Sequence, residues 1–172
     1  IVEESEADVV IHTAAISDIG ICQKDPQSSY FANVQIPLYL AAACKDRKLI
    51  CFSSDQVYSA CKEEGPYIEE VVKPGNIYAE HKLEMEERVL ELVSSAVMPG
   101  GAYNFGSETT QSMYEITEQF LQLLGKDVQL QDALPRHNLW MNCEKARKYG
   151  IEFSEVSDGL KRCLNDYKTV DK

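Results

Sequence analysis

Short apolar runs alternate with helical stripes in the first half of the chain. Val9–Ile11 is a continuous apolar run, and Lys48–Phe52 is apolar after its first residue; both segments predict buried strands. Between them, Asp25 and Pro26 are typical of a helix start, and an apolar stripe at helical spacing continues to Cys44. The order strand, helix, strand predicts a right-handed crossover and a parallel sheet.

The pattern also marks where helices stop and start again. Pro37 interrupts the first helical stripe, and we expect it to kink that helix or split it in two. A loop is predicted over 59–76, where glycine and proline recur, and a strong amphipathic helix over Ile77–Leu92. Further on, we predict a short strand over Ala102–Phe105 and a helix that opens with a capping box at Ser112.

Composition and charge narrow the range of functions. The 172 residues suit one domain, or one domain with a small addition. The formal net charge of −11 argues against a nucleic-acid partner, because phosphates need a cluster of Lys and Arg. No apolar run approaches a membrane span and no signal peptide is visible, so we expect a cytoplasmic protein without a membrane partner. The six cysteines form no Cys-x-x-Cys pair, so reduced thiols are favoured and no metal site is predicted.

Ser54, Tyr78 and Lys82 are the main candidates for chemistry. Tyr78 and Lys82 are four residues apart on a predicted helix, so their side chains lie on one face. An ammonium one turn away favours the phenolate and lowers a tyrosine pKa that is ordinarily about 10. Ser54 follows the second strand, where open α/β sheets bind ligands. We therefore expect a proton-transfer site for carbonyl reduction or alcohol oxidation, with the hydride supplied by a nicotinamide.

Each of these residues also has a plainer interpretation. Tyr-x-x-x-Lys pairs occur by chance on surface helices, and a serine pair after a strand often caps a turn. The joint layout favours the site, because a buried strand, Ser54, Tyr78 and Lys82 follow one another in that order. His12 is expected to be a packed, hydrogen-bonded histidine rather than a metal ligand. The glutamate-rich run Glu84–Glu91 is expected to be a solvated helix face.

Several segments carry a resemblance to a known family. They are Ile11–Ala15, Asn33–Val34, Phe52–Tyr58, Pro74–Lys82, Gly101–Ser107 and Pro135–Asn138. With these residues the chain resembles the extended short-chain dehydrogenase/reductases. Within that superfamily it is most similar to the dTDP-4-dehydrorhamnose reductases and the related sugar-nucleotide reductases and epimerases.

The resemblance implies an α/β fold in two parts. Residues 1–98 would be a partial dinucleotide-binding domain, a Rossmann-like parallel sheet flanked by helices, and 99–172 a small C-terminal α/β substrate-binding portion. The implied activity is reduction of a nucleotide-linked 4-keto sugar by NADPH or NADH, with a homodimer as an open possibility. Two alternatives remain: an NAD-dependent sugar-nucleotide 4-epimerase, and a catalytically silent, reductase-like regulatory subunit.

The resemblance also implies a role for each matching residue. Ser54 would bind the reacting sugar oxygen, Tyr78 would donate the proton, and Lys82 would lower the pKa of Tyr78 and hold the nicotinamide ribose. Asp55 would contact the sugar, with a turn-forming role as its alternative. Asn33 would support the neighbouring strand or a proton relay, unless it is a solvated helix asparagine. The residues beside the dinucleotide would be Thr13, Ala14, Ala15 and Ser53, together with the Tyr–Lys pair.

Two departures from the family pattern change the picture. Gln56 stands where sugar-nucleotide dehydratases carry a glutamate, and an amide cannot exchange a proton, so dehydration is disfavoured. The nine glycines include no glycine-rich loop of the kind that binds a pyrophosphate. We therefore expect the sequence to join separated pieces of a longer protein, incomplete at the N-terminus and between about Val93 and Gly101.

Overall fold

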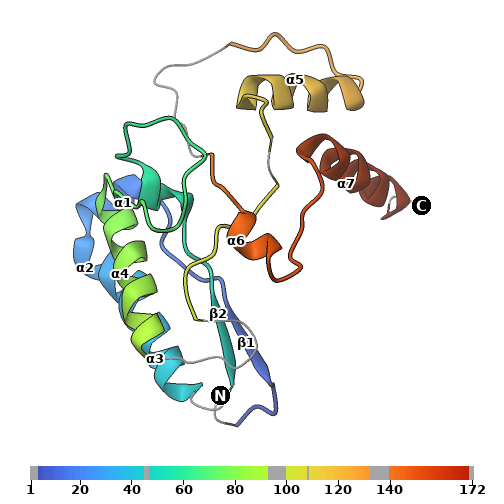
Figure 1. Ribbon diagram of the computed structural model, residues 1–172. Helices are drawn as coiled ribbons and strands as arrows, with labels where there is room; N and C mark the ends of the chain where they lie inside the picture. The colour runs from blue at the N-terminus through green and yellow to red at the C-terminus, as the bar shows by residue number, and fades with distance from the viewer. Residues whose placement is uncertain (1–3, 45–46, 93–99, 108, 132–139, 171–172) are drawn as a thin grey trace.

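A two-stranded parallel sheet forms the centre of the first half of the chain (Figure 1). The structure, a computed structural model, describes residues 4–44, 47–92, 100–107, 109–131 and 140–170. Strand β1 (Val9–His12) pairs with β2 (Lys48–Cys51) so that the first residues of the two strands lie opposite each other. Helices connect the two strands, which confirms the predicted parallel sheet with a helical crossover.

The helical crossover is broken at the proline, as expected. Helix α1 (Ile19–Lys24) precedes α2 (Pro26–Tyr30), whose N-cap Asp25 accepts a hydrogen bond from the Ser28 amide at 3.1 Å. A π-helical turn, η1 (Phe31–Gln35), then leads into α3 (Ile36–Ala43). The proline ring at position 37 would collide with the carbonyl one turn earlier in a regular helix. The wider π turn relieves that collision, so the chain continues as a second helix.

Helices α3 and α4 (Ile77–Leu92) cover one face of the sheet (Figure 1). The core between them is built on Ala41, Met85 and Val89, and half-buried side chains from α3 and β2 pack against it. The predicted inward face of α4 is therefore confirmed. Burial of this apolar face holds the helix, and with it Tyr78 and Lys82, against the strands.

The opposite face of the sheet is exposed, which corrects the prediction of fully buried strands. Val9 and Ile11 are 44% and 61% exposed, and Ile50 and Phe52 are 36% and 50% exposed. Successive side chains of a strand point to opposite faces, so a continuous apolar run suits a sheet with both faces covered. In the described part of the chain, helices cover only one of them.

The C-terminal part is helical where the structure describes it. It contains α5 (Met113–Leu123), α6 (Glu144–Arg147) and α7 (Val156–Val170), of which α5 and α7 pack together away from the sheet (Figure 1). The capping box at Ser112 is confirmed, because its side chain and that of Glu115 each accept a backbone N–H of the other residue. The predicted division between residues 98 and 99 lies outside the described residues, as does most of the expected junction near 93–101.

The predicted strand over Ala102–Phe105 is wrong, and Asn104 shows why. This segment is irregular, and its contacts run through the buried side chain of Asn104 rather than through a ladder. The Asn104 amide donates to the carbonyl oxygens of Tyr67 and Asn142, at 2.9 and 3.2 Å, and accepts from the Tyr58 hydroxyl at 2.9 Å. The hydrogen bonds of the Asn104 side chain thus hold this segment in place, where a strand would be held by its backbone hydrogen bonds to a neighbouring strand.

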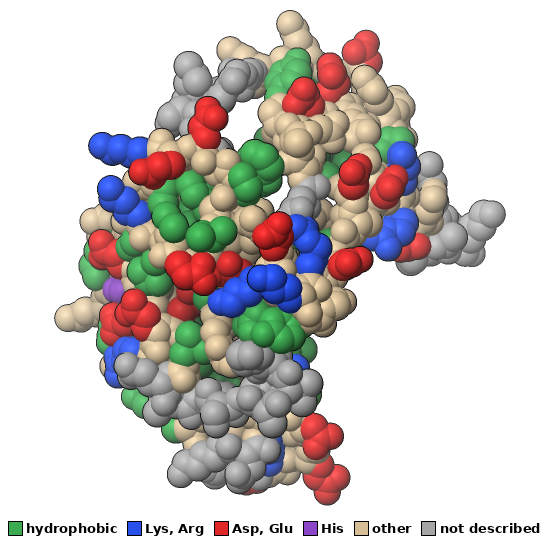
Figure 2. All heavy atoms as spheres, viewed as in Figure 1, with side chains coloured by type: hydrophobic (Ala, Val, Ile, Leu, Met, Phe, Trp, Pro, Cys, Tyr) green, Lys and Arg blue, Asp and Glu red, His purple; other side chains and the backbone are tan. Residues whose placement is uncertain are grey.

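The surface carries charged side chains of both signs: on the face drawn in Figure 2, Lys and Arg are interspersed with acidic side chains. Within the described residues, no helix combines the length and apolar character needed to cross a membrane. All six cysteines are reduced thiols; Cys22, Cys44 and Cys143 are buried, whereas Cys163 is exposed.

Candidate active site

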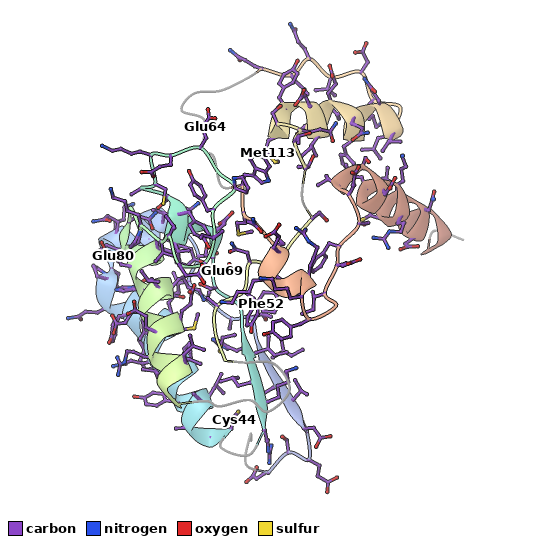
Figure 3. All side chains as sticks on the ribbon, viewed as in Figure 1. Cys44, Phe52, Glu64, Glu69, Glu80 and Met113 are labelled. Atoms are coloured by element: carbon purple, nitrogen blue, oxygen red, sulfur yellow. The ribbon has the colours of Figure 1, made fainter. Side chains whose placement is uncertain are left out.

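The carboxyl end of β2 carries the first part of the site. Phe52 follows the strand at the end nearest α6 (Figure 3), and Ser53 and Ser54 come next. Ser54 is extended and serves as the N-cap of a 3-10 helix, η2 (Asp55–Tyr58), where its hydroxyl accepts from the Gln56 amide at 3.2 Å. The short helix therefore turns the chain away from the sheet immediately after the serine pair.

The first turn of α4 carries the second part of the site. The side chain of Asn76 accepts from the Ala79 amide at 2.9 Å and so caps the helix. The same side chain donates to the Gln56 amide oxygen at 3.3 Å, which ties the helix start to η2. Tyr78 and Lys82 follow on one face and are 7% and 2% exposed. Both side chains are therefore buried and do not lie on the exposed surface of the helix.

Lys82 joins the helix to the strand end. Its ammonium donates to the carbonyl oxygen of Phe52 at 2.5 Å. Burial lowers the pKa of Lys82, while the neighbouring Cys51 and Glu86 act in the opposite direction. The same burial raises the pKa of the Cys51 thiol to about 11. The buried Lys82 side chain therefore contacts the residue that precedes the two serines.

The structure brings the three predicted catalytic residues to one end of the sheet but does not join all of them. The Ser54 hydroxyl donates to the Asp55 carboxylate at 3.3 Å and accepts from Gln56, and no hydrogen bond to the Tyr78 phenol is found among the described residues. The interpretation of Ser54 as a helix cap is thus confirmed. A cap and a substrate contact are compatible, because a hydroxyl keeps a second acceptor site.

The predicted dinucleotide loop follows β1. Thr13, Ala14 and Ala15 are exposed, so their backbone is accessible from solvent. Asn33, only 1% exposed, anchors the end of this loop: it accepts from the Ile16 amide at 3.1 Å and donates to the Ile16 carbonyl oxygen at 2.9 Å. Asn33 is therefore a buried support for the loop and not a solvated helix asparagine.

Two histidines lie near the site. His12 is packed as expected, but within the described residues its Nε2 atom is buried without a hydrogen-bond partner, and burial lowers its pKa. His81 is half-buried, and its Nδ1 lies 2.9 Å from the Ser29 hydroxyl. Ser29 also accepts from Asn33 at 3.2 Å, so a chain of hydrogen bonds runs from α4 to the loop after β1.

Glu86 is the site residue that the sequence analysis missed. Its carboxylate accepts a hydrogen bond from the Ser53 hydroxyl, and burial raises its pKa. Glu86 was included in the run Glu84–Glu91, which was interpreted as a solvated face, and that interpretation is wrong at this position. The available signal was spacing, since residues 78, 82 and 86 recur at every fourth position of one helix.

A cavity of about 540 Å³ lies in the C-terminal half, apart from these residues. Its lining comes from the Pro66 loop, from α5 and from the segments around α6 and α7, and includes Gln119, Trp140 and Arg147. Ser54, Tyr78 and Lys82 do not line it. Within the described residues, no group of three or more metal-ligating side chains is found.

Comparison with known proteins now identifies the family. The model of the RmlD substrate binding domain matches residues 1–122, which is more than half of the chain. The chain belongs to this family. The match confirms the resemblance to the extended short-chain dehydrogenase/reductases and their dTDP-4-dehydrorhamnose reductase branch.

Two curated proteins are similar to this chain in sequence. A dTDP-4-dehydrorhamnose reductase of Mycolicibacterium smegmatis is 35% identical over 89 residues, which are 50% of this chain and 27% of the relative. A probable low-salt glycan biosynthesis reductase of Haloferax volcanii is 30% identical over 111 residues, 62% of this chain and 36% of the relative. The chain thus spans about a third of the length of the curated relatives it matches.

Solved structures support the fold. The dTDP-4-dehydrorhamnose reductase of Bacillus anthracis, in complex with NADP, superimposes with a TM-score of 0.80 at 17% identity, over 96% of this chain and 81% of that chain. This likeness confirms the α/β fold class with a Rossmann-like parallel sheet.

Proposed function

We propose that this chain forms the proton-transfer part of a reductase that acts on a nucleotide-linked 4-keto sugar. The observation that carries the proposal is the buried pair of Tyr78 and Lys82 on α4, bound through Lys82 to the strand end that bears Ser54. Membership of the RmlD family and the similarity to the reductases of Mycolicibacterium smegmatis and Haloferax volcanii support the same activity.

The cofactor we propose is NADPH or NADH. A nicotinamide dinucleotide would supply a hydride to the keto carbon of the sugar. The residues present fit such a group, because Thr13–Ala15 form an exposed loop of small side chains at the carboxyl end of β1. Asn33 holds the end of that loop in place through Ile16. The NADP complex of the Bacillus anthracis reductase is consistent with this assignment.

Each catalytic residue has a distinct task in the proposed reaction. The Tyr78 phenol would donate its proton to the sugar oxygen as the keto carbon is reduced. The Lys82 ammonium would stabilise the negative charge left on that phenol and contact the nicotinamide ribose. Ser54 would hold the same sugar oxygen, and Asp55 would contact the sugar. Gln56 argues against dehydration, since its amide is bound to Asn76 and cannot exchange a proton.

A turnover series in the full-length protein tests the proposal. With NADPH and a dTDP-linked 4-keto sugar, we expect Tyr78→Phe and Lys82→Met each to lower kcat by about 10²- to 10⁴-fold. Tyr39→Phe and Lys48→Met are matched controls, because both residues are exposed on nearby elements. Near-parental rates for both site variants would contradict the assigned roles.

The same preparation separates the alternatives. A sugar-nucleotide 4-epimerase regenerates its cofactor, so the purified protein would carry bound dinucleotide and show no net consumption of NADPH. A silent regulatory subunit would bind no dinucleotide in the full-length form and would copurify with a partner enzyme. A cytoplasmic location and a homodimer remain predictions that fractionation and sedimentation would check.

A further inference from the structure

Two adjacent contacts fasten the end of β2 to α4. Lys82 donates to the Phe52 carbonyl oxygen at 2.5 Å, and one turn further along the helix Glu86 accepts from the Ser53 hydroxyl. The next residue of the chain is Ser54, and one turn before Lys82 is Tyr78. The two contacts therefore fix the distance between the serine and the tyrosine on which the proposed reaction depends.

The chemistry of the two contacts is unequal. The Phe52 carbonyl is a neutral acceptor, so the buried ammonium of Lys82 gains from it a hydrogen bond but no countercharge. The nearby countercharge on the helix is Glu86, which stabilises the ammonium electrostatically. A buried cation without a countercharge loses its proton more readily, because burial disfavours the charged form.

We propose that Glu86 is a positioning residue of this site: through Ser53 it fixes the strand end that carries Ser54, and through its charge it keeps Lys82 protonated beside Tyr78. The proposal rests on the proposed reductase function. Glu86 acts through Ser53 and Lys82 and is not placed in contact with the substrate. Other titratable groups interact with Lys82 or Glu86: His12, Cys51 and Tyr58 from neighbouring elements, and Glu87 from the same helix.

The test compares Glu86→Gln and Ser53→Ala in the full-length protein, with Glu87→Gln as the matched control on the exposed side of the same helix. Glutamine keeps an acceptor for Ser53 but removes the charge, whereas Ser53→Ala removes the contact and keeps the charge. We expect Ser53→Ala to lower kcat by about 10- to 100-fold, because small misplacements at a reacting centre have effects of that size. We expect Glu86→Gln to act through the charge on Lys82, so its loss of kcat should grow as the pH rises. We expect KM to change by less than about twofold, since the substrate contacts remain.

The pH profile of kcat separates positioning from a merely structural role. Removal of a negative charge makes neighbouring groups lose their protons more readily, so the alkaline limb of Glu86→Gln should move about one unit towards acid. The limb of Ser53→Ala and of Glu87→Gln should stay in place. A Glu86→Gln profile whose alkaline limb does not move would overturn the proposal, whether kcat falls or not. Tyr78→Phe, assayed in parallel, identifies the other failure: if it retains near-parental turnover, the reductase function itself is wrong.

Discussion

The replacement of Asn33 by alanine gives the most direct test of how the fold supports the site. Asn33 lies on the crossover and makes three side-chain hydrogen bonds: two with the backbone of Ile16 and one with the Ser29 hydroxyl. Alanine removes all three: the Ile16 amide loses its partner, and the Ile16 carbonyl oxygen keeps only the weak donor Cys22 Sγ, 3.3 Å away. The loop Thr13–Ala15 then loses the anchor at its end.

The size of the effect follows from these three hydrogen bonds. Each contributes about 1 kcal/mol net to stability, and a buried group left without a partner costs more than the bond itself. Ile16 is half-buried, so water can replace part of what is lost. We expect Asn33→Ala to lower the free energy of unfolding by about 3 kcal/mol. With a urea m-value of about 2 kcal/mol per molar, the midpoint should fall by about 1.5 M.

Two measurements check this expectation. Urea unfolding, followed by circular dichroism, gives the midpoint, and fluorescence titration with NADPH gives the affinity for the dinucleotide, which should weaken because the loop after β1 is released. Gln27→Ala is the matched control, since Gln27 is exposed on α2. A midpoint for Asn33→Ala within about 0.3 M of the parent would refute the reasoning, because it would mean that the three hydrogen bonds contribute almost nothing.

Two further predictions concern stability. Burial lowers the pKa of both His12 and His81, so the unfolded chain takes up protons at higher pH than the folded one; stability is therefore fully present above about pH 6.5 and falls as the pH drops below it. Urea midpoints at about pH 7.5 and about pH 5 measure this slope, which should flatten in His81→Gln. Met85→Ala, in the core between α3 and α4, should cost about 2–5 kcal/mol, whereas Leu90→Ala, 40% exposed on α4, should cost far less.

Much of the fold could be predicted from the sequence because its signals are local. The N-cap at Asp25, the capping box at Ser112 and the apolar face of Ile77–Leu92 each depend on residues within a few positions of one another. Pro37 likewise predicts an interruption of the regular helix, because its ring would collide with the carbonyl one turn earlier. These predictions hold because tertiary contacts agree with the local preference.

The failures have a different physical origin. The segment Ala102–Phe105 has a strand-like pattern, but a strand needs a partner, and the hydrogen bonds of Asn104 to Tyr67 and Asn142 settle its position instead. The apolar runs of β1 and β2 predict burial on both faces, whereas the described helices cover one. Both errors concern contacts between distant parts of the chain, which no local pattern contains.

The site shows the same division between local and distant information. Tyr78 and Lys82 could be found because their spacing of four is a property of one helix, and Ser54 because it follows an apolar run. Glu86 shares that spacing, yet its role depends on Ser53, which lies 33 residues away in the chain. A glutamate in an acidic run is usually solvated, and the packing of α4 on the strand end leaves this one half-buried. The proposed role of Glu86 therefore depends on a contact between distant parts of the chain, which no local sequence pattern contains.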